Sequence, residues 1–412
     1  MPSPKNPLKH LHPSDLRAAA QLATQATQGV ARIAEGVHHS VLGRLGLAGT
    51  GEQGQTSGLT GLVYGSVRGA AQLVGKGLQA ALSKLEPWLL SAHTPLDSPE
   101  RAAVLAALGG VLGDHLAATN NPLATPMTLR FAGQVLDWQR MPPKPELTGK
   151  VLILIHGLCM NDLQWRSTQA GLVADHGLAL AQALGYTSVY LRYNTGLHIS
   201  QNGHLLSHAL EQLAAHWPIP LQEISVLAHS MGGLVIRSAV YAAGQDQAAW
   251  ARSLKNMVFL GTPHHGAPLE KAGNWIDAIL GSTAYSKPFA KLGQLRSSGI
   301  TDLRYGYVVD EDWRHQHRFH RTPDSRQPVP LPTGVASYTV AATVAAPRSL
   351  LAQRLLGDGL VPLRSALGQH SDAKRSLAFA KASQYIAYRT NHLQLLSRPQ
   401  VAQQVIAWLT PA

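Results

Sequence analysis

The chain has 412 residues, 45% of them hydrophobic and 14% charged, and its formal net charge is +12. This length and composition exclude a mainly disordered chain, and they suit one large domain with an appendage, or two domains. The only cysteine is Cys159, which excludes an intramolecular disulfide and a zinc site built from cysteines, and favours a reducing compartment.

The positive charge is spread along the chain rather than gathered in one block. Such a spread is typical of a solubility feature, although it also suits an anionic membrane surface or a polyanion. Because no recognisable motif accompanies it, we expect no specific nucleic-acid partner. The sequence shows neither a secretory signal nor a long apolar run, so it predicts a cytoplasmic protein, with peripheral membrane association left open.

Residues 1–125 are predicted to form a helical extension. Apolar side chains recur at helical spacing from Leu22 to Val41 and from Leu59 to Leu85, which is typical of helices with one apolar face. A third helix is expected to begin at Pro99. These helices either pack on each other or on the rest of the protein, or the second one contacts a membrane surface. The sequence leaves both alternatives open.

Short apolar runs rich in β-branched residues follow, and residues 126–412 are predicted to form an α/β domain. Helical stretches separate several runs, as at Asp175–Leu184 and Gly203–Trp217. This alternation predicts a mostly parallel, doubly wound sheet with ligands at the carboxyl ends of the strands. The fragments Thr128–Phe131 and Gln134–Trp138 are expected to add an antiparallel edge. The predicted core strands are VLILIHG, TSVYLRYN, EISVLAHS, KNMVFLGTP, YTVAATV and QYIAYR.

Between two of these strands the sheet pattern lapses, and residues 267–337 are predicted to form a cap or lid insertion. The segment LEKAGNWIDAILG has the pattern of an amphipathic helix with Trp275 on its apolar face. We expect this face to cover a pocket.

The segment ISVLAHSMGGLVIRSA joins a predicted strand to a predicted helix. A strand that ends in small-x-Ser-x-Gly and leads directly into a helix is the nucleophile elbow, in which a tight turn presents the serine oxygen at the helix N-terminus. Ala228 takes the place of the first glycine of the pattern, and its small side chain still lets the helix cross the strand. Ser230 is therefore the predicted nucleophile.

A serine hydroxyl is protonated at neutral pH, so it needs a histidine base, which in turn needs an acid to orient it. In this architecture the acid and the histidine follow the serine, in loops beyond later strands. Asp358, in LLGDGLVPLRSA, and His392, in YRTNHLQLL, occupy these places. Asp372 and His370 are the alternatives, but neither directly follows a recognisable strand.

Acyl transfer also needs N–H donors for the oxyanion, one from the residue after the nucleophile and one from a loop after an early strand. These donors are predicted to be Met231 and Leu158, the latter because Gly157 lets the chain turn. Cys159 lies in the same loop, and we expect it to pack rather than react, because no base is indicated near it.

Several further side chains are expected to line the pocket or the cap: His156, His229, His264, His265 and Trp275. The cluster from His315 to His320 lacks the carboxylate or cysteine framework of a metal site. The sequence predicts neither a metal nor a cofactor.

The motifs HGL, AHSMGGLV, LGTPHHG, GDGLVP and NHLQLL, in this order, resemble the signature series of α/β-hydrolase lipases and esterases, including the triacylglycerol lipase-like and GPI-inositol-deacylase-like groups. The resemblance covers about residues 128–412. It implies an α/β-hydrolase fold and a carboxylic-ester hydrolase. Ser230 would attack, His392 would shuttle the proton and Asp358 would hold the imidazole, while the N–H groups of Leu158 and Met231 stabilise the oxyanion.

The sequence and this resemblance predict hydrolysis of a hydrophobic, lipid-like acyl ester through an acyl-enzyme. An acyltransferase, thioesterase or polyester depolymerase with the same residues is an alternative, since water or another acceptor resolves the same acyl-enzyme. A non-catalytic, membrane-associated scaffold with a hydrolase fold is a further alternative, although a scaffold has no need for all three side chains.

Overall fold

The computed structural model describes residues 15, 18, 20–25, 72, 99–141, 146–169, 172–267, 297–314, 324–346 and 357–411. The chain divides into two compact units. The first comprises Met1–Arg101 and Ala118–Leu123, and the second comprises Ala102–Ala117 and Ala124–Ala412. Most of the helices predicted between Leu22 and Leu85 lie outside the described residues.

In the first unit, residues near the N-terminus contact residues about a hundred positions later. Arg101 forms an ion pair with Asp15, with Nη2 and Oδ1 2.7 Å apart. The side-chain amide of Asn121 donates to the carbonyl of Ala18 at 3.3 Å. These contacts hold the two segments of the unit together.

Helix α3 (Pro99–Ala118) begins at the residue predicted for it. Its middle part packs closely in the second unit because two glycines leave room. A Cβ on Gly110 would lie 2.1 Å from Sγ of Cys159, and one on Gly113 would lie 1.9 Å from Oδ1 of Asn194. Larger residues at either position would push the helix away.

Within the described residues, α3 contains the one segment, Arg101–Ala118, that is long and apolar enough to cross a membrane, with a mean hydropathy of 1.2. A buried helix of a globular protein meets the same criterion. The close glycine contacts of α3 are those of a packed helix. The predicted extension, residues 1–125, therefore includes a helix that packs in the second unit, and the boundary at residue 125 stays a prediction.

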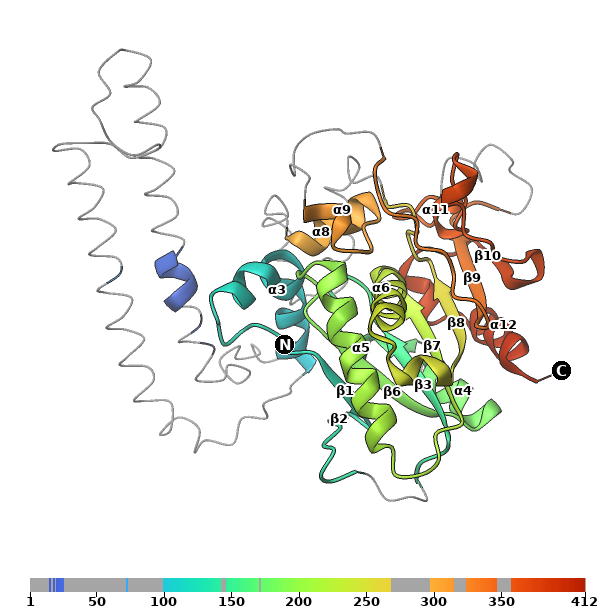
Figure 1. Cartoon of the computed structure of the whole chain (residues 1–412), viewed down its shortest axis with the longest axis horizontal. Helices are drawn as coiled ribbons and strands as arrows, with labels where there is room; N and C mark the ends of the chain where they lie inside the picture. The colour runs from blue at the N-terminus through green and yellow to red at the C-terminus, as the bar shows by residue number, and fades with distance from the viewer. Residues whose placement is uncertain are drawn as a thin grey trace, which may run out of the picture. The chain divides into compact units, whose positions relative to one another are not determined.

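An eight-stranded sheet forms the centre of the second unit, with the order β10-β9-β8-β7-β3-β6-β1-β2 (Figure 1). The strands from β10 to β6 in this order pair in parallel, while β1 and β2 form an antiparallel edge. The predicted mostly parallel sheet and its antiparallel edge are thus confirmed. The strands are β1 (Thr128–Phe131), β2 (Gln134–Val135), β3 (Lys150–Ile155), β6 (Thr187–Arg192), β7 (Glu223–His229), β8 (Leu254–Leu260), β9 (Ala336–Thr343) and β10 (Gln384–Tyr388).

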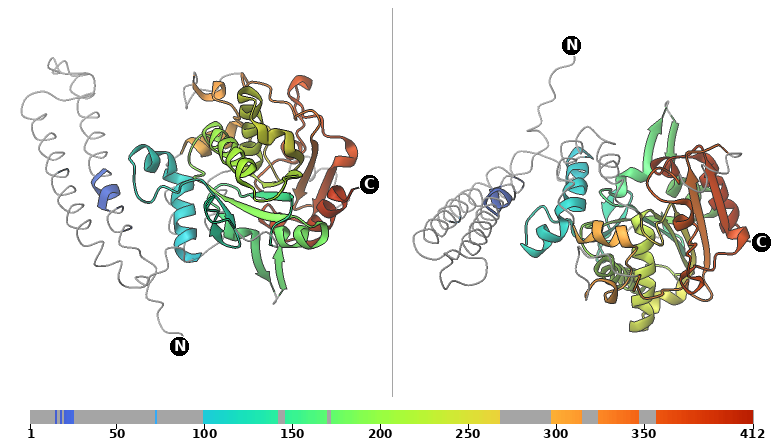
Figure 2. Two further views of the ribbon diagram at one scale, coloured as in Figure 1. Left: turned by 60° about the horizontal axis from the view of Figure 1, so that its bottom comes forward. Right: turned by 90° about the horizontal axis from the view of Figure 1, so that it is seen from above.

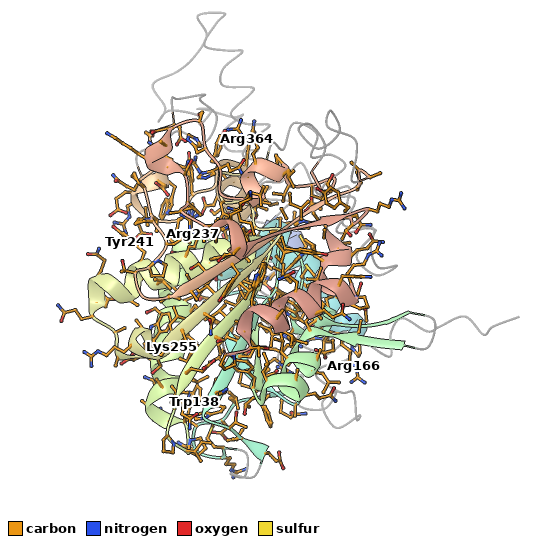
Figure 3. All side chains as sticks on the ribbon, turned by 90° about the vertical axis from the view of Figure 1, so that its right-hand side faces the viewer. Trp138, Arg166, Arg237, Tyr241, Lys255 and Arg364 are labelled. Atoms are coloured by element: carbon orange, nitrogen blue, oxygen red, sulfur yellow. The ribbon has the colours of Figure 1, made fainter. Side chains whose placement is uncertain are left out.

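Helices cover both faces of this sheet, and strand β3 shows how the faces are divided. Val151, Ile153 and Ile155 belong to an apolar cluster that includes buried residues of α5 and α6. Leu152 and Leu154, which point the opposite way, pack with residues of α4 and α12. Side chains fill both faces of the twisted sheet (Figure 3). The covering helices are α4 (His176–Leu184), α5 (Ile199–His216), α6 (Met231–Asp246) and α12 (Pro399–Leu409).

A separate hairpin, β4 (Arg166–Gln169) and β5 (Leu172–Asp175), projects from the body of the second unit (Figure 2). No strand was predicted from the sequence of these residues. Next to its first strand, the buried carboxylate of Asp162 pairs with the guanidinium groups of Arg130 and Arg192. This ion cluster fixes the chain between β3 and the hairpin.

Of the predicted cap, residues 267–337, the structure describes only parts. These include α8 (Ser298–Tyr305) and α9 (Glu311–Arg314). Ser297, the N-cap of α8, donates its hydroxyl to the carbonyl of Gly110 at 2.7 Å. The segment around Trp275 lies outside the described residues, so the pocket-covering helix stays a prediction. The remaining short helices are α11 (Leu363–Ala366), η3 (Asp162–Trp165), η4 (Ala249–Ser253), η7 (Ala373–Arg375), η8 (Lys381–Ser383) and η9 (Leu393–Leu396).

Candidate active site

The predicted elbow lies between β7 and α6. Ser230 has φ 55° and ψ −124°, a sparsely populated conformation that costs a residue with a side chain about 1–3 kcal/mol. Its N–H donates to the carbonyl of Leu260 at 2.8 Å, and its own carbonyl accepts from Gly233 at 3.0 Å. These hydrogen bonds hold the strained turn at the end of the strand.

Two glycines directly after the serine let the helix approach the sheet. A Cβ on Gly232 would lie 2.6 Å from the carbonyl oxygen of Ile155. A Cβ on Gly233 would lie 2.0 Å from Oγ1 of Thr262. No side chain fits at either position without moving backbone or a packed side chain. Steric contact with the neighbouring chain therefore explains why the motif has glycine at these two positions.

Asp358 and His392 are in direct contact, although 34 residues separate them. Nδ1 of His392 donates to Oδ2 of Asp358 at 2.6 Å, and both residues are only 2% exposed. The other carboxylate oxygen accepts from the N–H groups of Leu360 and Val361 at 2.9 and 2.7 Å. The carboxylate is thus held in place by its own loop.

Ser230 and His392 both lie at the carboxyl end of β8. The serine N–H bonds to Leu260, and a Cβ on the next residue, Gly261, would lie 3.1 Å from the imidazole of His392. Within the described part of the chain, Oγ of Ser230 and Nε2 of His392 are buried without hydrogen-bond partners. Because Nδ1–H donates to Asp358, Nε2 is the acceptor nitrogen. The two atoms are thus not hydrogen-bonded to each other in this structure, and transfer of the serine proton to Nε2 requires the hydroxyl to come within hydrogen-bond reach of the imidazole.

The predicted oxyanion loop lies directly against the elbow. A Cβ on Gly157 would be 3.0 Å from Cβ of Ser230. The loop is held by the Tyr193 hydroxyl, which donates to the carbonyl of His156 at 2.9 Å, and by Thr195, whose Oγ1 accepts from the N–H of Cys159 at 3.2 Å. Among the loop hydrogen bonds of the described residues, none uses the N–H of Leu158. This N–H and that of Met231, the first residue of α6, are available near the serine.

Cys159 is buried against α3 and has a positive φ of 56°. Burial raises the pKa of its thiol to about 12. The thiol therefore stays protonated at neutral pH and is a poor nucleophile. The contact with Gly110 supports the packing role expected for it.

Two neighbouring histidines support the site without being exposed. Burial lowers the pKa of His156 to about 4 and that of His229 well below its usual value, so both are neutral at pH 7. The Nε2 of His229 lies 3.1 Å from the carbonyl oxygen of His392, to which it donates. Its ring is 4.6 Å from the His392 ring. His229 thus holds the loop that carries His392.

The two alternative residues lie elsewhere. His370 pairs with Asp324, with Nε2 and Oδ2 3.3 Å apart. The carboxylate of Asp372 accepts from the N–H of Lys374 at 3.0 Å, and its side chain is half exposed. Within the described residues, neither forms a hydrogen bond or an ion pair with Ser230 or His392.

The remaining predicted pocket residues have different surroundings. The N–H of His265 donates to Ser365 at 3.1 Å and its Nε2 donates to the carbonyl of Gly368 at 3.0 Å, so this histidine joins two loops. His264 is buried and lines a separate hollow, described below. Trp275 and the cluster His315–His320 lie outside the described residues. Among the residues that are described, no group of three acidic, histidine or cysteine side chains is arranged to hold a metal ion.

Sequence reasoning missed several residues that shape this region. Tyr193 and Thr195 hold the predicted oxyanion loop, and their position at the end of the predicted strand TSVYLRYN and directly after it was the available signal. Arg237 was also missed. It is the one charged residue in the buried first part of α6, and that isolation within GLVIRSAV was the signal that could have found it.

The sheet order, the strained elbow between β7 and α6 and the buried Asp–His pair define an α/β-hydrolase-fold protein similar to lipases and esterases. The family model of the PGAP1-like alpha/beta domain matches residues 146–328. Comparison with curated proteins gives no match.

Several solved structures are similar to this chain. Mature lipase BlEst2 of Bacillus licheniformis is 17% identical, with a TM-score of 0.41 over 65% of this chain and 94% of that one. Lipase B of Aspergillus fumigatus is 12% identical, with a TM-score of 0.41 over 69% of this chain and 56% of that one. Lipase 1 from Pelosinus fermentans is 10% identical, with a TM-score of 0.36 over 64% of this chain and 98% of that one.

Proposed function

We propose that the protein is a serine hydrolase that cleaves carboxylic esters through an acyl-enzyme at Ser230. The observation that carries this proposal is the buried hydrogen bond of 2.6 Å between His392 and Asp358, at the strand end where the elbow presents the serine. Nε2 of His392 and Oγ of Ser230 have no hydrogen-bond partner among the described residues, each other included, so the proposal requires the serine hydroxyl to approach Nε2 when substrate binds.

In the proposed reaction, Nε2 of His392 takes the proton of the Ser230 hydroxyl as Oγ bonds to the ester carbonyl carbon. The carbonyl oxygen becomes an oxyanion, which the N–H groups of Leu158 and Met231 stabilise. Collapse of this intermediate breaks the ester bond, and the proton on His392 passes to the departing alcohol. Water then attacks the acyl-enzyme by the same route, which releases the acid and restores the serine.

Asp358 has two tasks in this scheme. Its carboxylate keeps the proton of the resting imidazole on Nδ1, and it stabilises the cation that forms when Nε2 accepts a proton. The N–H groups of Leu360 and Val361 hold one oxygen, which leaves the other directed at His392. The acid therefore needs no rearrangement during the reaction.

A hydrophobic, lipid-like acyl ester is the proposed substrate. Leu158 and Met231, whose N–H groups face the reacting carbonyl in this scheme, both belong to the large apolar cluster on this face of the sheet. The feature that favours an acyl chain over a polar acid is the apolar face predicted around Trp275 in the cap. Ser230 is only 1% exposed, which also supports a substrate bound away from bulk water.

A fluorophosphonate probe tests the proposed nucleophile. The wild type should be labelled covalently and Ser230→Ala should not, while His208→Ala, a change on the exposed face of α5, should be labelled like the wild type. Equal labelling of Ser230→Ala would contradict the proposal by showing that another residue reacts with the probe. No labelling of either protein, when both are folded, would favour a non-catalytic scaffold.

The substrate is tested with p-nitrophenyl esters of increasing acyl length and with lipid vesicles. We expect long acyl esters to be cleaved faster than short ones. Addition of an alcohol acceptor separates hydrolysis from acyl transfer, because a transferase forms the new ester in place of the free acid. Co-sedimentation with vesicles tests the peripheral membrane contact predicted for the N-terminal helices, which remains part of this proposal.

A further inference from the structure

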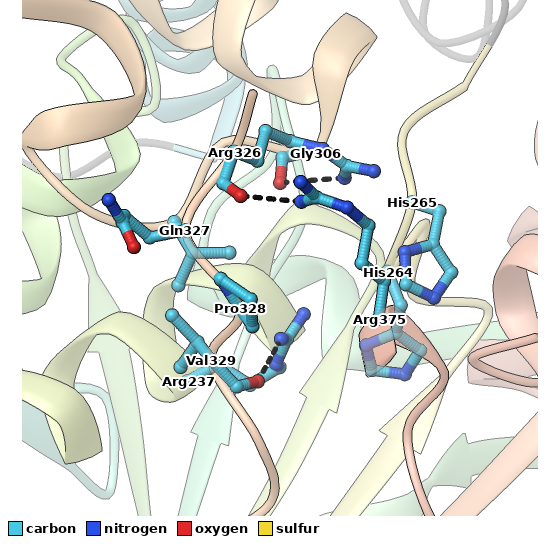
Figure 4. Close-up of a pocket in the computed structure, with 10 residues that line it drawn as sticks. Arg237, His264, His265, Gly306, Arg326, Gln327, Pro328, Val329 and Arg375 are labelled. Atoms are coloured by element: carbon cyan, nitrogen blue, oxygen red, sulfur yellow. Dashed lines mark hydrogen bonds between the residues drawn. The ribbon is translucent and has the colours of Figure 1, made fainter. Parts of the chain in front are cut away.

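A second buried group of polar side chains lines a hollow that includes none of the three proposed catalytic residues. The hollow is small and partly open to solvent (Figure 4). Arg237 and His264 lie at its inner end and Arg326 and Arg375 at the other. It is lined by Arg237, His264, His265, Gly306, Val308, Arg326, Gln327, Pro328, Val329 and Arg375.

Arg237 is a buried cation without an acidic partner among the described residues. It is 6% exposed, and its Nη2 donates to the carbonyl of Val329 at 2.6 Å. Its Nε and Nη1 are buried and have no hydrogen-bond partner in the described part of the chain. Burial lowers its pKa only to about 10, so it remains charged at neutral pH. An unpaired buried charge is costly, and an anion in the hollow would compensate it.

His264 adds a neutral donor and acceptor to the same hollow. It is 1% exposed, and neither ring nitrogen has a partner among the described residues. Its ring packs against Phe259 and Phe379, with centroids 4.9 and 5.5 Å away. Burial lowers its pKa well below the usual value, so the neutral ring offers one N–H and one lone pair.

The other charged groups of the hollow are already engaged. Arg326 forms an ion pair with Asp324 at 2.6 Å, and Arg375 lies 3.5 Å from the same carboxylate. The carboxylate of Asp312 accepts three backbone N–H groups and forms no ion pair with Arg237, although its negative charge acts at a distance to raise the pKa of Arg237 against the larger effect of burial. Arg375 also lies 3.6 Å from the carboxylate of Asp372, so the two guanidinium groups of the rim have two carboxylates beside them. The charge of the hollow without an ion-pair partner among the described residues is therefore that of Arg237.

We propose that this hollow binds a phosphate group. A guanidinium presents its donors in a planar fork that matches two oxygens of a phosphate. A carboxylate has no proton to give, so it would leave the acceptor nitrogen of His264 unpaired. A protonated phosphate oxygen donates to that acceptor nitrogen. Another phosphate oxygen accepts from the N–H of the same ring. The same chemistry occurs in free phosphate and in the headgroup of a phosphate monoester lipid.

Isothermal titration of the full chain with inorganic phosphate, in buffer of constant ionic strength, tests this site. We expect wild type to bind phosphate and Arg237→Met to bind it at least about tenfold more weakly. Lys255→Met removes a positive charge from an exposed position on β8, labelled with Arg237 in Figure 3, and should bind like wild type. Circular dichroism checks that each variant folds, and Arg237→Lys replaces Arg237→Met if the latter does not. Arg237→Lys keeps the positive charge but lacks the planar pair of N–H donors of a guanidinium, so we again expect weaker phosphate binding than in wild type.

Vesicles of phosphatidylcholine, with and without phosphatidic acid, separate the two sources of the phosphate. Binding of inorganic phosphate that depends on Arg237 supports a free ligand. Binding only to vesicles with phosphatidic acid, again lost in Arg237→Met, supports a lipid headgroup. If neither probe binds the folded wild type, or if Arg237→Met binds as well as wild type, the proposed site is wrong. Neither outcome depends on Ser230, so the proposed hydrolase activity is tested separately.

Discussion

His392 and His264 both follow strands of the same sheet and both are buried, yet they differ in their surroundings. His392 donates to a carboxylate that lies 2.6 Å away, whereas His264 has no hydrogen-bond partner among the described residues. A cation formed on His392 is stabilised by its partner, and one formed on His264 would be isolated. A buried histidine beside a carboxylate is therefore suited to accept a proton as a general base. A buried histidine without a carboxylate is suited to bind a ligand as a neutral ring.

Asp162 and Arg237 show the same contrast for residues with a permanent charge. The carboxylate of Asp162 lies between two arginines, and its place is explained by the fold alone. The guanidinium of Arg237 has only the carbonyl of Val329 as a partner within the described residues. A buried charge without an ion-pair partner in the fold indicates a binding site for a ligand of opposite charge. A buried charge with such partners indicates a structural role.

Loss of the nucleophile should have the largest effect. We expect Ser230→Ala to lower kcat/KM for a p-nitrophenyl ester by about 10⁴-fold or more, because no other hydroxyl occupies the elbow. His392→Ala should lower it by a similar factor. Steady-state kinetics measures both, with His208→Ala as the control. A hydrolysis rate in Ser230→Ala close to wild type would show that ester cleavage uses another residue.

Loss of the carboxylate partner should have the next largest effect. Asp358→Asn keeps the shape of the side chain but no longer stabilises the cation on His392, so kcat should fall by about 10³- to 10⁴-fold. Asp372→Asn is the matched control, and its kcat should be unchanged. If the two changes had equal effects, the assignment of Asp358 over Asp372 would be wrong.

Much of the sheet could be predicted because each core strand is a short apolar run between turn residues. The pairs that matter at its edge, such as Asp358 with His392, followed from the rule that loops after parallel strands meet. The hairpin of β4 and β5 could not be predicted, since its strands RSTQ and LVAD are short and mostly polar or mixed. They are strands because they pair with each other, from Arg166 with Asp175 to Gln169 with Leu172.

Arg237 and His264 could not be recognised as a pair from the sequence. A single arginine in a helix most often extends to solvent, where its charge needs no partner. Its contact with Val329 spans 92 residues, and no local pattern predicts a contact of that length. His264 was expected near the pocket from the motif LGTPHHG, but its lack of partners depends on packing against Phe259 and Phe379.

Loss of the Asp162 carboxylate, which pairs with two arginines, should have a moderate effect on stability. Asp162→Asn leaves two buried arginines without their carboxylate, so we expect the free energy of unfolding to fall by about 3–5 kcal/mol. Chemical denaturation followed by circular dichroism measures this loss. Asp137→Asn, at an exposed position, should change it little. A loss as small as that of the control would mean that the ion cluster contributes little to the fold.

The smallest effect should be on the pH dependence of stability. The folded pKa of His264 is lowered, so between the unfolded value near pH 6.5 and the lower folded value the unfolded chain binds a proton that the folded chain does not. Falling pH therefore favours unfolding, and full stability is present above pH 6.5. His156 and His229 act in the same direction.

Replacing His264 removes one of the protons that the chain takes up when it unfolds in this pH range. In His264→Gln, the slope of the unfolding free energy between pH 6.5 and 5 should become shallower by up to about 1.4 kcal/mol per pH unit. The slope separates this effect from any constant loss of packing, because a packing loss shifts all pH values equally. His208→Gln, at an exposed position, should keep the wild-type slope. An unchanged slope in His264→Gln would show that His264 titrates alike in the folded and unfolded chain, and that its ring is accessible to protons rather than held neutral in the hollow.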